Sequence, residues 1–537
     1  MTDRTTRAER MARPHIRDVA QAVAEEHGAC PRPIQLRKTN LDTGETEQVL
    51  IPCGATQASV CPPCAERNKV LRAAQCREGW HLETEPIPSP VPPDDYLRWL
   101  AEQRADLQVA RDQADARGDD TAELDDLIGE LDRVLRHLGV RGTLGTETTG
   151  TKARRRRSTR RRQDAPDLPR RKVNSRTVGR TYTSPDGKTY RPSMFLTFTC
   201  DSYGPVRDDG TPVDPRSYDY QRAARDAIHF PALFDRLIQN LRRFLGYDLQ
   251  YFATIEPQRR LAPHAHIATR GTISRSDLRR VLGATYHQVW WPATDTVRFD
   301  GDQLPVWHEA SGRYLDPATG ELLPSWDEAL DAIGPADPPL HVARFGPKFD
   351  AQGVLGHSRD SARCIGYLTK YLVKDLGTCH TPDTDAQRDH VVRLVDALRY
   401  EPCSPTCANW LRYGITPKHP RKGLVPGACK GKAHRPDHLG YAGRRVLVSR
   451  KWSGKTLADH RGDRKQWLMD MLGLSATSDT GRYRWEQVTP NDTDYLPPPK
   501  RLVQVIAERM RWKHALDEAR RRTEERADDI SAGGRAA

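Results

Sequence analysis

Residues 255–270 read IEPQRRLAPHAHIATR, and the rest of the chain is best interpreted outward from this stretch. His264 and His266 stand two positions apart in an extended segment, so both imidazoles project from the same face of a strand. Glu256 ends an alternating segment that begins at Tyr251, and seven residues separate it from His264. If the two segments pair as a hairpin, Glu256 lies beside both histidines. Two neutral imidazoles and one carboxylate suit a divalent ion that keeps open coordination positions.

A second stretch, GYLTKYLVK at residues 366–374, places Tyr367 and Tyr371 four positions apart, so both lie on one face of a helix. A phenol has an ordinary pKa of about 10 and is a poor nucleophile at neutral pH unless positive charge stabilises its anion. Lys370 and Lys374, together with a nearby metal ion, would supply that charge. Taken alone, a His-x-His pair often binds no metal, and tyrosines at helical spacing more often pack in a core. The combination of a metal site with two tyrosines indicates phosphodiester chemistry.

Together these stretches resemble the HUH endonuclease superfamily, specifically rolling-circle replication initiators with two tyrosines. The resemblance rests on HAH at residues 264–266 and YLTKYLVK at residues 367–374, and FLTFTC at residues 195–200 is similar to the first strand motif of those proteins. Three further stretches resemble the initiators of actinobacterial plasmids and integrative elements: CG…CPPCAE near the N-terminus, PGACKGKAH, and GRRVLVSRKWSGKTL. The resemblance therefore covers most of the chain.

This resemblance implies a site-specific, metal-dependent endonuclease and strand transferase in which Glu256, His264 and His266 hold Mg²⁺ or Mn²⁺. The ion would act as a Lewis acid on the scissile phosphate. Tyr371 directly follows the motif lysine, so it is expected to be the initiating nucleophile, and Tyr367 the terminating one. The two roles could be exchanged.

The reaction implied is a transesterification at a replication origin that leaves a 5′-phosphotyrosyl link and a free 3′-hydroxyl. Lys374 is expected to contact the substrate or the leaving group, and Lys370 a phosphate. The hydroxyl would prime a host DNA polymerase, and the ester keeps the bond energy, so rejoining the displaced strand needs no ATP. Because the sequence has no helicase motif, a host helicase would unwind the duplex. The cut strand must be single-stranded or in a hairpin to reach the metal.

The composition agrees with a DNA-binding protein. The 537 residues carry a formal net charge of +13, which favours a polyanionic partner, nucleic acid before membrane. No stretch approaches the roughly 18 apolar residues of a membrane span, and the N-terminus lacks an apolar signal core. We therefore expect a cytoplasmic protein, in which thiols stay reduced. The 11 cysteines are then better interpreted as metal ligands and core residues than as disulfides.

Two groups of cysteines have spacings typical of structural zinc sites. The first group is Cys30, Cys53, Cys61 and Cys64, of which the last two form CPPC. The second group follows C-x3-C-x21-C-x4-H and consists of Cys403, Cys407, Cys429 and His434. Cys76 competes for the first site and His438 for the second. The CPPC could instead be redox-active, but no βαβ pattern surrounds it.

The predicted fold class is α+β, an HUH-endonuclease core with a central antiparallel sheet and helices on one face. Strands are expected at 194–199, 251–256 and 264–269, an edge strand at 341–345, helices at 230–246, 274–289 and 361–376, and an accessory insertion at 290–335. The expected domains are a Cys-rich zinc module at 1–92, a helical hairpin at 93–140, a basic flexible linker at 141–190, the catalytic domain at 191–395, a Cys/His zinc and DNA-binding module at 396–496, and a charged helical tail at 497–537.

Two basic segments are predicted to contact DNA. The linker would make salt-sensitive phosphate contacts, although a solvated linker without a specific role is a nearly even alternative. The segment GRRVLVSRKWSGKT is basic and aromatic; its SGKT is no phosphate loop, because position 449 is Ser where that motif needs Gly. The predicted DNA-binding residues are Arg154, Arg155, Arg156, Arg157, Arg160, Arg161, Arg162, Arg444, Arg445, Arg450 and Lys451.

Three other functions compete with the initiator. A two-tyrosine HUH transposase shares the chemistry and can carry an N-terminal cysteine module. A conjugative relaxase usually places its tyrosine before the histidine motif, the reverse of the order here. A non-catalytic, zinc-containing DNA-binding regulator with a decayed site is disfavoured because the carboxylate, both histidines and both tyrosines are present. The sequence leaves the oligomeric state and the origin sequence open.

Overall fold

A computed structural model describes most of the chain. The described residues are 16–80, 82, 84–86, 95–137, 168–178, 182–183, 185–187, 189–355, 358–370, 383–472 and 482–533. The chain divides into two compact units, Met1–Pro86 with Gln163–Ala537, and Ile87–Arg162. Within the described part, no helix combines the length and the apolar character that a membrane span requires.

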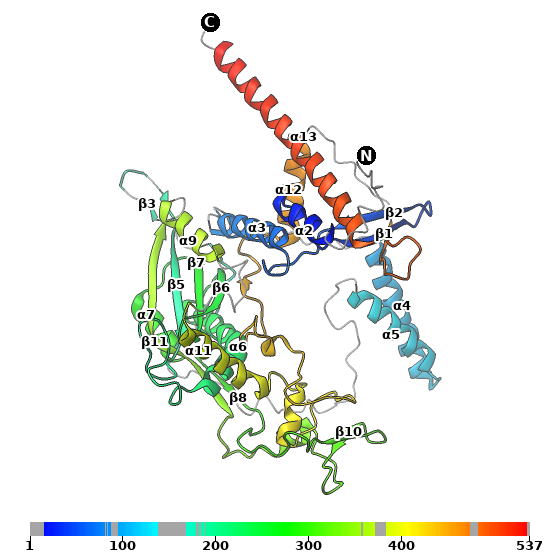
Figure 1. Ribbon diagram of the computed structural model, residues 1–537, viewed down its shortest axis with the longest axis vertical. Coiled ribbons are helices and arrows are strands. Elements are labelled where there is room, and N and C mark those ends of the chain that lie inside the picture. The colour runs from blue at the N-terminus through cyan, green and yellow to red at the C-terminus, as the bar shows by residue number, and fades with distance from the viewer. Residues whose placement is uncertain are drawn as a thin grey trace, which may run out of the picture. The chain divides into compact units, whose positions relative to one another are not determined.

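The larger unit is built on a six-stranded antiparallel sheet in the order β12-β6-β7-β5-β11-β8 (Figure 1). Its strands are β5 (Pro192–Cys200), β6 (Tyr251–Pro257), β7 (Pro263–Arg270), β8 (Tyr286–Val289), β11 (His341–Leu355) and β12 (Val446–Val448). The central strands β5 and β7 are largely buried on both faces, and every residue of β7 is buried. A strand of this kind needs cover on both sides.

The first face of the sheet packs on helices α6 (Tyr220–Leu245) and α7 (Arg275–Gly283), and α11 (Asp385–Tyr400) packs on α6. Alternate residues of β5, among them Leu196 and Phe198, contribute to this core together with Phe230 and Phe234 of α6. Asp219 caps the N-terminus of α6 by accepting a hydrogen bond from the Arg222 backbone N–H.

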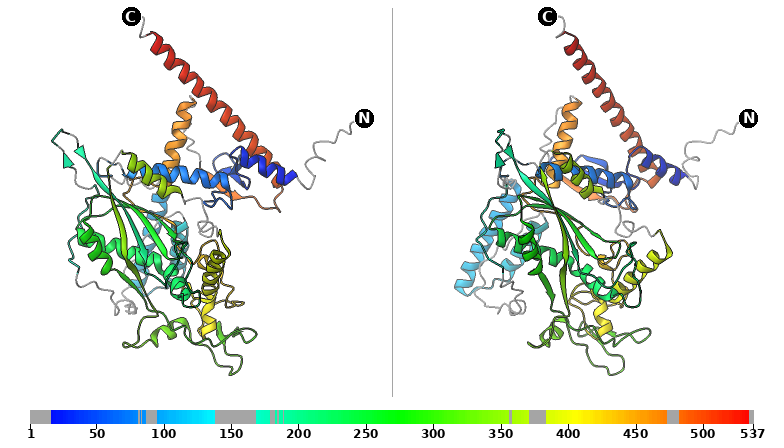
Figure 2. Two further views of the ribbon diagram at one scale, coloured as in Figure 1. Left: turned by 60° about the vertical axis from the view of Figure 1, so that its left-hand side comes forward. Right: turned by 90° about the vertical axis from the view of Figure 1, so that its left-hand side faces the viewer.

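The second face of the sheet is covered by α3 (Pro62–Trp80) and α9 (Arg359–Lys370), which also contact each other. Figures 1 and 2 show these two helices side by side at one end of the sheet. The core on this face joins Trp80, Phe195, Phe252, Leu368 and Trp452. The prediction that helices lie on one face only is therefore wrong: the apolar residues on the second face of β5, β6 and β7 are buried by α3, a helix from the N-terminal segment.

Three element boundaries also differ from the predictions. The expected helix 274–289 ends at Gly283, and its second half is β8, because the residues from Tyr286 on pair with β11. The strand expected at 341–345 continues to Leu355 and lies between β5 and β8 rather than at an edge. The helix expected from residue 230 begins ten residues earlier, at Tyr220, and accommodates Pro231 in its interior.

The segments around the sheet form smaller substructures. In the expected insertion, β9 (Val306–His308) pairs with β10 (Arg313–Leu315), and α8 (Trp326–Asp331) packs on the 3-10 helix η2 (Ala408–Tyr413) through Trp326 and Trp410. A two-residue ladder joins β3 (Tyr182–Thr183) to β4 (Thr189–Tyr190). The remaining elements near the C-terminus are η3 (Lys432–His434) and α12 (Leu457–Met471).

The two ends of the chain meet in one sheet. The strands β1 (Ile34–Asn40), β2 (Thr46–Ile51) and β13 (Tyr483–Gln487) form the order β13-β1-β2, and α2 (Ile16–Glu26) packs on α13 (Pro498–Gly533). Arg37 of β1 makes a bidentate ion pair with Asp494, with Nη2–Oδ1 2.5 Å and Nε–Oδ2 3.0 Å. Residues expected in the N-terminal module, the C-terminal module and the tail thus share one substructure.

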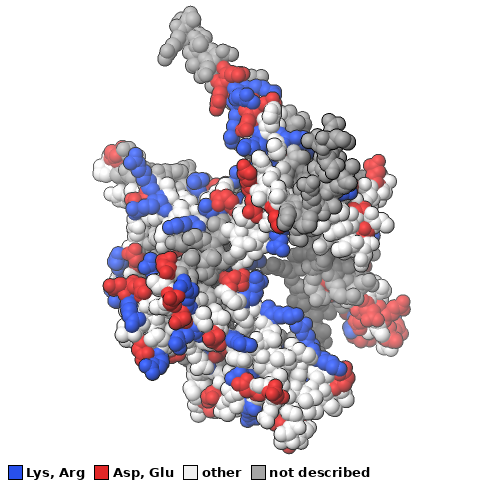
Figure 3. All heavy atoms as spheres, viewed as in Figure 1, with Lys and Arg blue, Asp and Glu red and all other residues white. Residues whose placement is uncertain are grey.

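The smaller unit is an antiparallel pair of helices, α4 (Asp95–Arg117) and α5 (Ala122–His137), as expected for that segment. Arg104 is buried and pairs with Asp132 across the two helices at 3.0 Å. Acidic side chains gather on this pair (Figure 3).

We expect Gly79→Ala to destabilise the larger unit. A Cβ atom at position 79 would lie 2.1 Å from Cδ1 of Trp452, whose fully buried ring cannot move aside. Overpacking of this kind costs about 1–3 kcal/mol, more than the roughly 1 kcal/mol that alanine gains over glycine in a helix. The measurement is the free energy of unfolding in urea.

The matched control is Gly462→Ala, in the exposed interior of α12, where a Cβ meets no atom within 4 Å. This change should leave the free energy of unfolding unchanged or raise it slightly. A Gly79→Ala protein as stable as the control would show that α3 does not lie against Trp452.

Candidate metal and catalytic site

The hairpin of β6 and β7 brings the three predicted metal ligands together. Glu256 lies directly opposite His264, and Thr254 opposite His266, in the antiparallel register. The Nε2 atom of His266 lies 3.0 Å from Oε1 of Glu256, and the two imidazole centroids are 4.3 Å apart. One ligand atom from each of the three residues lies within 4.8 Å of the others.

Two threonines of β5 orient the imidazoles from the neighbouring strand. The Nδ1 atom of His264 lies 2.6 Å from Oγ1 of Thr199, and Nδ1 of His266 lies 3.1 Å from Oγ1 of Thr197. When Nδ1–H donates to the hydroxyl oxygen, the lone pair of Nε2 is left to bind a metal ion. Outer-shell hydrogen bonds of this kind fix the tautomer and the ring orientation of metal-binding histidines.

The environment keeps His264 neutral, as a metal ligand must be. Burial, and then the neighbouring His266 and Arg260, lower the pKa of His264 to about 3. The group thus offers two imidazole nitrogens and one carboxylate oxygen on largely buried residues, a donor set that fits a divalent cation.

We expect Thr199→Val to weaken Mn²⁺ binding by about 10–100-fold, the usual cost of losing an outer-shell partner. The change removes the oxygen that accepts from His264 and keeps the size and branching of the side chain. Isothermal titration calorimetry measures the affinity. The control is Thr254→Val, on the same face opposite His266, for which the described residues show no hydrogen bond to either histidine. Equal affinities for both variants would contradict the orienting role.

Of the two predicted nucleophiles, Tyr367 lies within the described residues. It stands in α9, 39% exposed, with its ring 4.7 Å from the ring of His266 and 6.0 Å from that of Phe195. Leu368 and Ile365 of the same helix are buried in the core on the second face of the sheet. Lys370 is the last residue of α9. Tyr371 and Lys374 lie outside the described residues.

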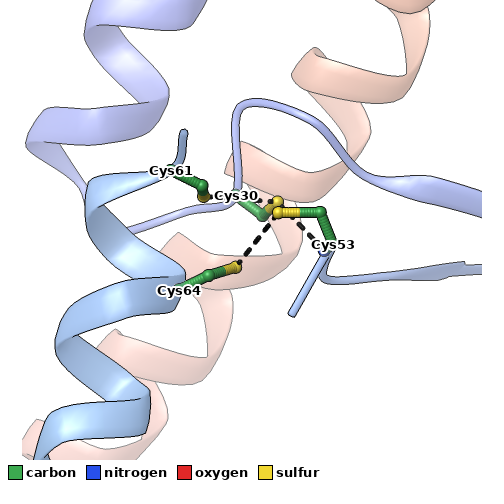
Figure 4. A group of neighbouring side chains, drawn as sticks. All are labelled: Cys30, Cys53, Cys61 and Cys64. Atoms are coloured by element: carbon green, nitrogen blue, oxygen red, sulfur yellow. Dashed lines mark hydrogen bonds between the residues drawn. The ribbon is translucent and has the colours of Figure 1, made fainter. Parts of the chain in front are cut away.

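The first cysteine group comes together at the N-terminus of α3 (Figure 4). The sulfur atoms of Cys30 and Cys61 are 3.8 Å apart, and those of Cys53 and Cys64 are 3.7 Å apart. All four sulfur atoms lie within 4.8 Å of one another. Cys76 takes no part in the group, because its side chain is buried beside Trp80 and Trp452.

Burial makes two of these thiols poor acids unless a cation is present. It raises the pKa of Cys30 to about 11 and raises the pKa of Cys61 further still. A tetrahedral zinc ion would stabilise the four thiolates, so this group could hold a structural metal such as zinc.

The second group also gathers as the spacing predicts, within 4.8 Å. Nε2 of His434 lies 3.5 Å from Sγ of Cys407, and its Nδ1 donates to the carbonyl oxygen of Leu398 at 2.9 Å. That second bond directs Nε2 toward the sulfur atoms. His438 is not a member; its Nε2 lies 3.7 Å from Asp437 instead. This group could likewise hold a structural metal such as zinc.

The predicted DNA-binding residues fall into distinct environments. The seven linker arginines lie outside the described residues. Nζ of Lys451 pairs with Asp248 at 3.4 Å, and Nε of Arg445 donates to the carbonyl oxygen of Ile255 at 3.5 Å, so both already have partners in the fold. Arg444 and Arg450 are exposed. Figure 3 shows Lys and Arg interspersed with Asp and Glu over the face in view, so that DNA contacts must depend on local clusters.

The structure also adds residues that the motifs did not indicate. Thr197 and Thr199 belong to the FLTFTC strand, whose alternation indicates a half-buried strand but not that two hydroxyls meet the histidines. Phe195, on the same face, stacks on His266 with a centroid distance of 5.7 Å. Recognising these contacts requires the pairing of β5 with β7.

The fold and the site define an α+β protein with one candidate divalent-metal centre beside a tyrosine and two cysteine-rich sites. The chain belongs to the family described as replication initiator protein, pSAM2 (RepSA), which matches residues 16–525. This membership supports a role in the initiation of replication and implies binding to origin DNA. The searches of curated proteins and of solved structures found no match.

Proposed function

We propose that this initiator starts rolling-circle replication by nicking one origin strand through metal-dependent tyrosine transesterification. The observation that carries the proposal is the position of Tyr367, whose ring lies 4.7 Å from that of His266 in the Glu256–His264–His266 group. A phenol, two imidazoles and a carboxylate at one place suit attack on a phosphodiester. Membership of a replication-initiator family supplies the DNA substrate.

Glu256, His264 and His266 would hold Mg²⁺ or Mn²⁺. When bound, the ion supplies Lewis-acid polarisation of the scissile phosphate and favours ionisation of a nearby phenol. Thr197 and Thr199 hold the imidazoles in orientation. Tyr371 would be the first nucleophile and Tyr367 the second. Lys370 and Lys374 would contact phosphate or the leaving group.

The proposed reaction conserves the number of phosphodiester bonds. The phenolic oxygen of Tyr371 attacks phosphorus, the bond from phosphorus to the 3′-oxygen breaks, and the released 3′-hydroxyl takes up a proton. The 5′-phosphate stays esterified to the tyrosine, and the free 3′-hydroxyl primes a host polymerase behind a host helicase. After one round, Tyr367 cleaves the regenerated origin, and the 3′-hydroxyl that this cleavage releases attacks the first tyrosyl ester and closes the displaced strand.

The test uses the full chain with labelled single-stranded oligonucleotides that tile the DNA around its own gene, in Mn²⁺, on a denaturing gel. A covalent protein–DNA band that requires Mn²⁺ and disappears in Tyr371→Phe supports the proposal and locates the nick. Tyr367→Phe should keep the first adduct and lose rejoining. If the folded protein gives no band with any oligonucleotide, the proposal is wrong and a non-catalytic DNA-binding role is favoured.

A further inference from the structure

Helix α3 connects the first cysteine group to the second face of the central sheet. Cys61 precedes the helix and Cys64 lies in its first turn, whereas Trp80 at its other end donates from Nε1 to Oγ of Ser193 in β5 at 2.6 Å. Because both ends are fixed, the residues between them have defined positions over the face that carries the candidate active site. Arg72 lies midway along this helix and is half-buried.

Two arginines from distant parts of the chain act electrostatically on Arg72. Arg444 lies two residues before the start of β12. Arg461 lies in α12, which packs on α3. Burial, and then the charges of Arg444 and Arg461, lower the pKa of the Arg72 guanidinium. Its Nη1 donates to Oε1 of Gln75 at 2.7 Å, a neutral partner.

No ion pair to an aspartate or glutamate involves Arg72, Arg444 or Arg461 anywhere in the described ranges. The positive charges of Arg444 and Arg461 disfavour the charged form of Arg72. An anion bound near the three guanidinium groups would relieve this repulsion. Arginine presents donors in a planar fork that matches phosphate oxygens.

The arginine cluster lies on the same face as the candidate active site. β12 pairs with β6, with Val446 opposite Thr254, and the pairing continues where the Ile255 N–H donates to the Arg445 carbonyl oxygen at 2.9 Å. One residue further, the alternation places Arg444 beside the Glu256 end of β6, on the face of the candidate metal ligands. The electrostatic effect of Arg444 on Arg72, in the helix on that face, agrees with this placement.

We propose that Arg72, Arg444 and Arg461 form a phosphate-binding site for the DNA strand that enters the candidate active site. The inference rests on the proposed function in taking a single DNA strand as the occupant of that face. Successive backbone phosphates would contact the edge of the sheet and α3 while the scissile phosphate lies over β6 and β7. The first cysteine group then has a role in substrate binding, because it anchors the helix that carries Arg72.

The test measures binding without cleavage. Fluorescence anisotropy with a 5′-labelled mixed-sequence single-stranded oligonucleotide, in EDTA and over a series of salt concentrations, gives the Kd and its salt dependence for the full chain. Arg444→Gln/Arg461→Gln should raise the Kd about ten-fold or more and reduce the slope of log Kd against log salt by about 1.4, since each single-strand phosphate contact contributes about 0.7. Adding Arg72→Gln should reduce this slope by about 0.7 more.

The matched control removes the same charge from the other face. Arg388→Gln/Arg393→Gln changes two exposed arginines of α11, which packs on α6, and should leave the Kd and the slope nearly unchanged. Arg72→Gln alone should not lower the melting temperature, because it removes like-charge repulsion. A lower melting temperature with an unchanged salt slope would show a structural role and overturn the proposal.

The outcomes separate this inference from the proposed function. If the wild-type chain binds the oligonucleotide and the Arg444/Arg461 variant binds it equally well with the same slope, the phosphate site is refuted, whether or not the chain forms covalent adducts. If the variant loses binding while no adduct forms with the wild type in Mn²⁺, the phosphate site stands and the nicking proposal fails. A wild-type chain that binds no single strand overturns the phosphate site.

Discussion

His264→Ala should lower the rate of origin nicking about a thousand-fold in Mn²⁺, as measured by single-turnover formation of the covalent adduct. The change removes one of three ligands and leaves Glu256 and His266 unable to fix the ion where the phosphate reacts. Loss of metal assistance is worth several kcal/mol of transition-state stabilisation, and about 4 kcal/mol corresponds to three orders of magnitude in rate. Binding of a single-stranded oligonucleotide in EDTA should be unchanged, because none of the three metal ligands takes part in DNA binding without the ion.

His438→Ala is the matched control at the same end of the sheet. His438 is half-buried and lines a small cavity with Glu256, but its Nε2 faces Asp437 and it is not in the ligand group. This variant should nick at close to the wild-type rate. Nicking by His264→Ala at the wild-type rate would remove the metal site from the mechanism, whereas equal losses in both variants would indicate general disruption of that end of the sheet.

Cys407→Ser should remove one of the two zinc ions that the cysteine groups predict and unfold the segment around η2. The thiol belongs to the second group and precedes the fully buried Trp410, which packs on Trp291 and Trp326. Structural zinc sites contribute folding free energy directly, so a loss of about 4 kcal/mol or more is expected. Metal analysis by mass spectrometry should fall from two zinc ions per chain to one, and the tryptophan emission should shift to longer wavelength.

The control for the zinc prediction is Cys364→Ser, a buried cysteine of α9 that belongs to neither group. It should keep two zinc ions per chain even if its own core loosens. Because His434 is held by Leu398 of α11, which packs on α6, loss of the second site should also lower the melting temperature of the larger unit. A Cys407→Ser protein that retains both zinc ions would show that this group binds no metal.

The local features of the sites could be predicted from the sequence because the ligands are close in the chain. A period-two alternation on each side of a seven-residue turn fixes which residues share a face, so Glu256 was expected beside His264 and His266. The first cysteine group contains one short-range pair and the second contains two, and the tetrahedral requirement of zinc predicts that the distant members join them. The structure brings each set within 4.8 Å.

The predicted ends of the helix that stops at residue 283 and of the strand that stops at residue 355 are wrong for a different reason. Residues 284–289 have a composition that suits either helix or strand, and pairing with β11 selects the strand. The pattern of β11 was recognisable only over its first residues, because a register shift between Phe345 and Phe349 interrupts the alternation.

By itself, the sequence determined the local geometry of this protein: the strand pair with its candidate metal ligands, the cysteine sets and the helix that carries Tyr367. Only the tertiary structure decided what covers the second face of the sheet and which strand completes its edge. Those choices join Trp80 to Ser193, β13 to β1 and β12 to β6. The periodicity of apolar residues indicates which face of an element is buried. Which other element packs on that face depends on complementary shape and apolar area contributed by residues far away in the chain.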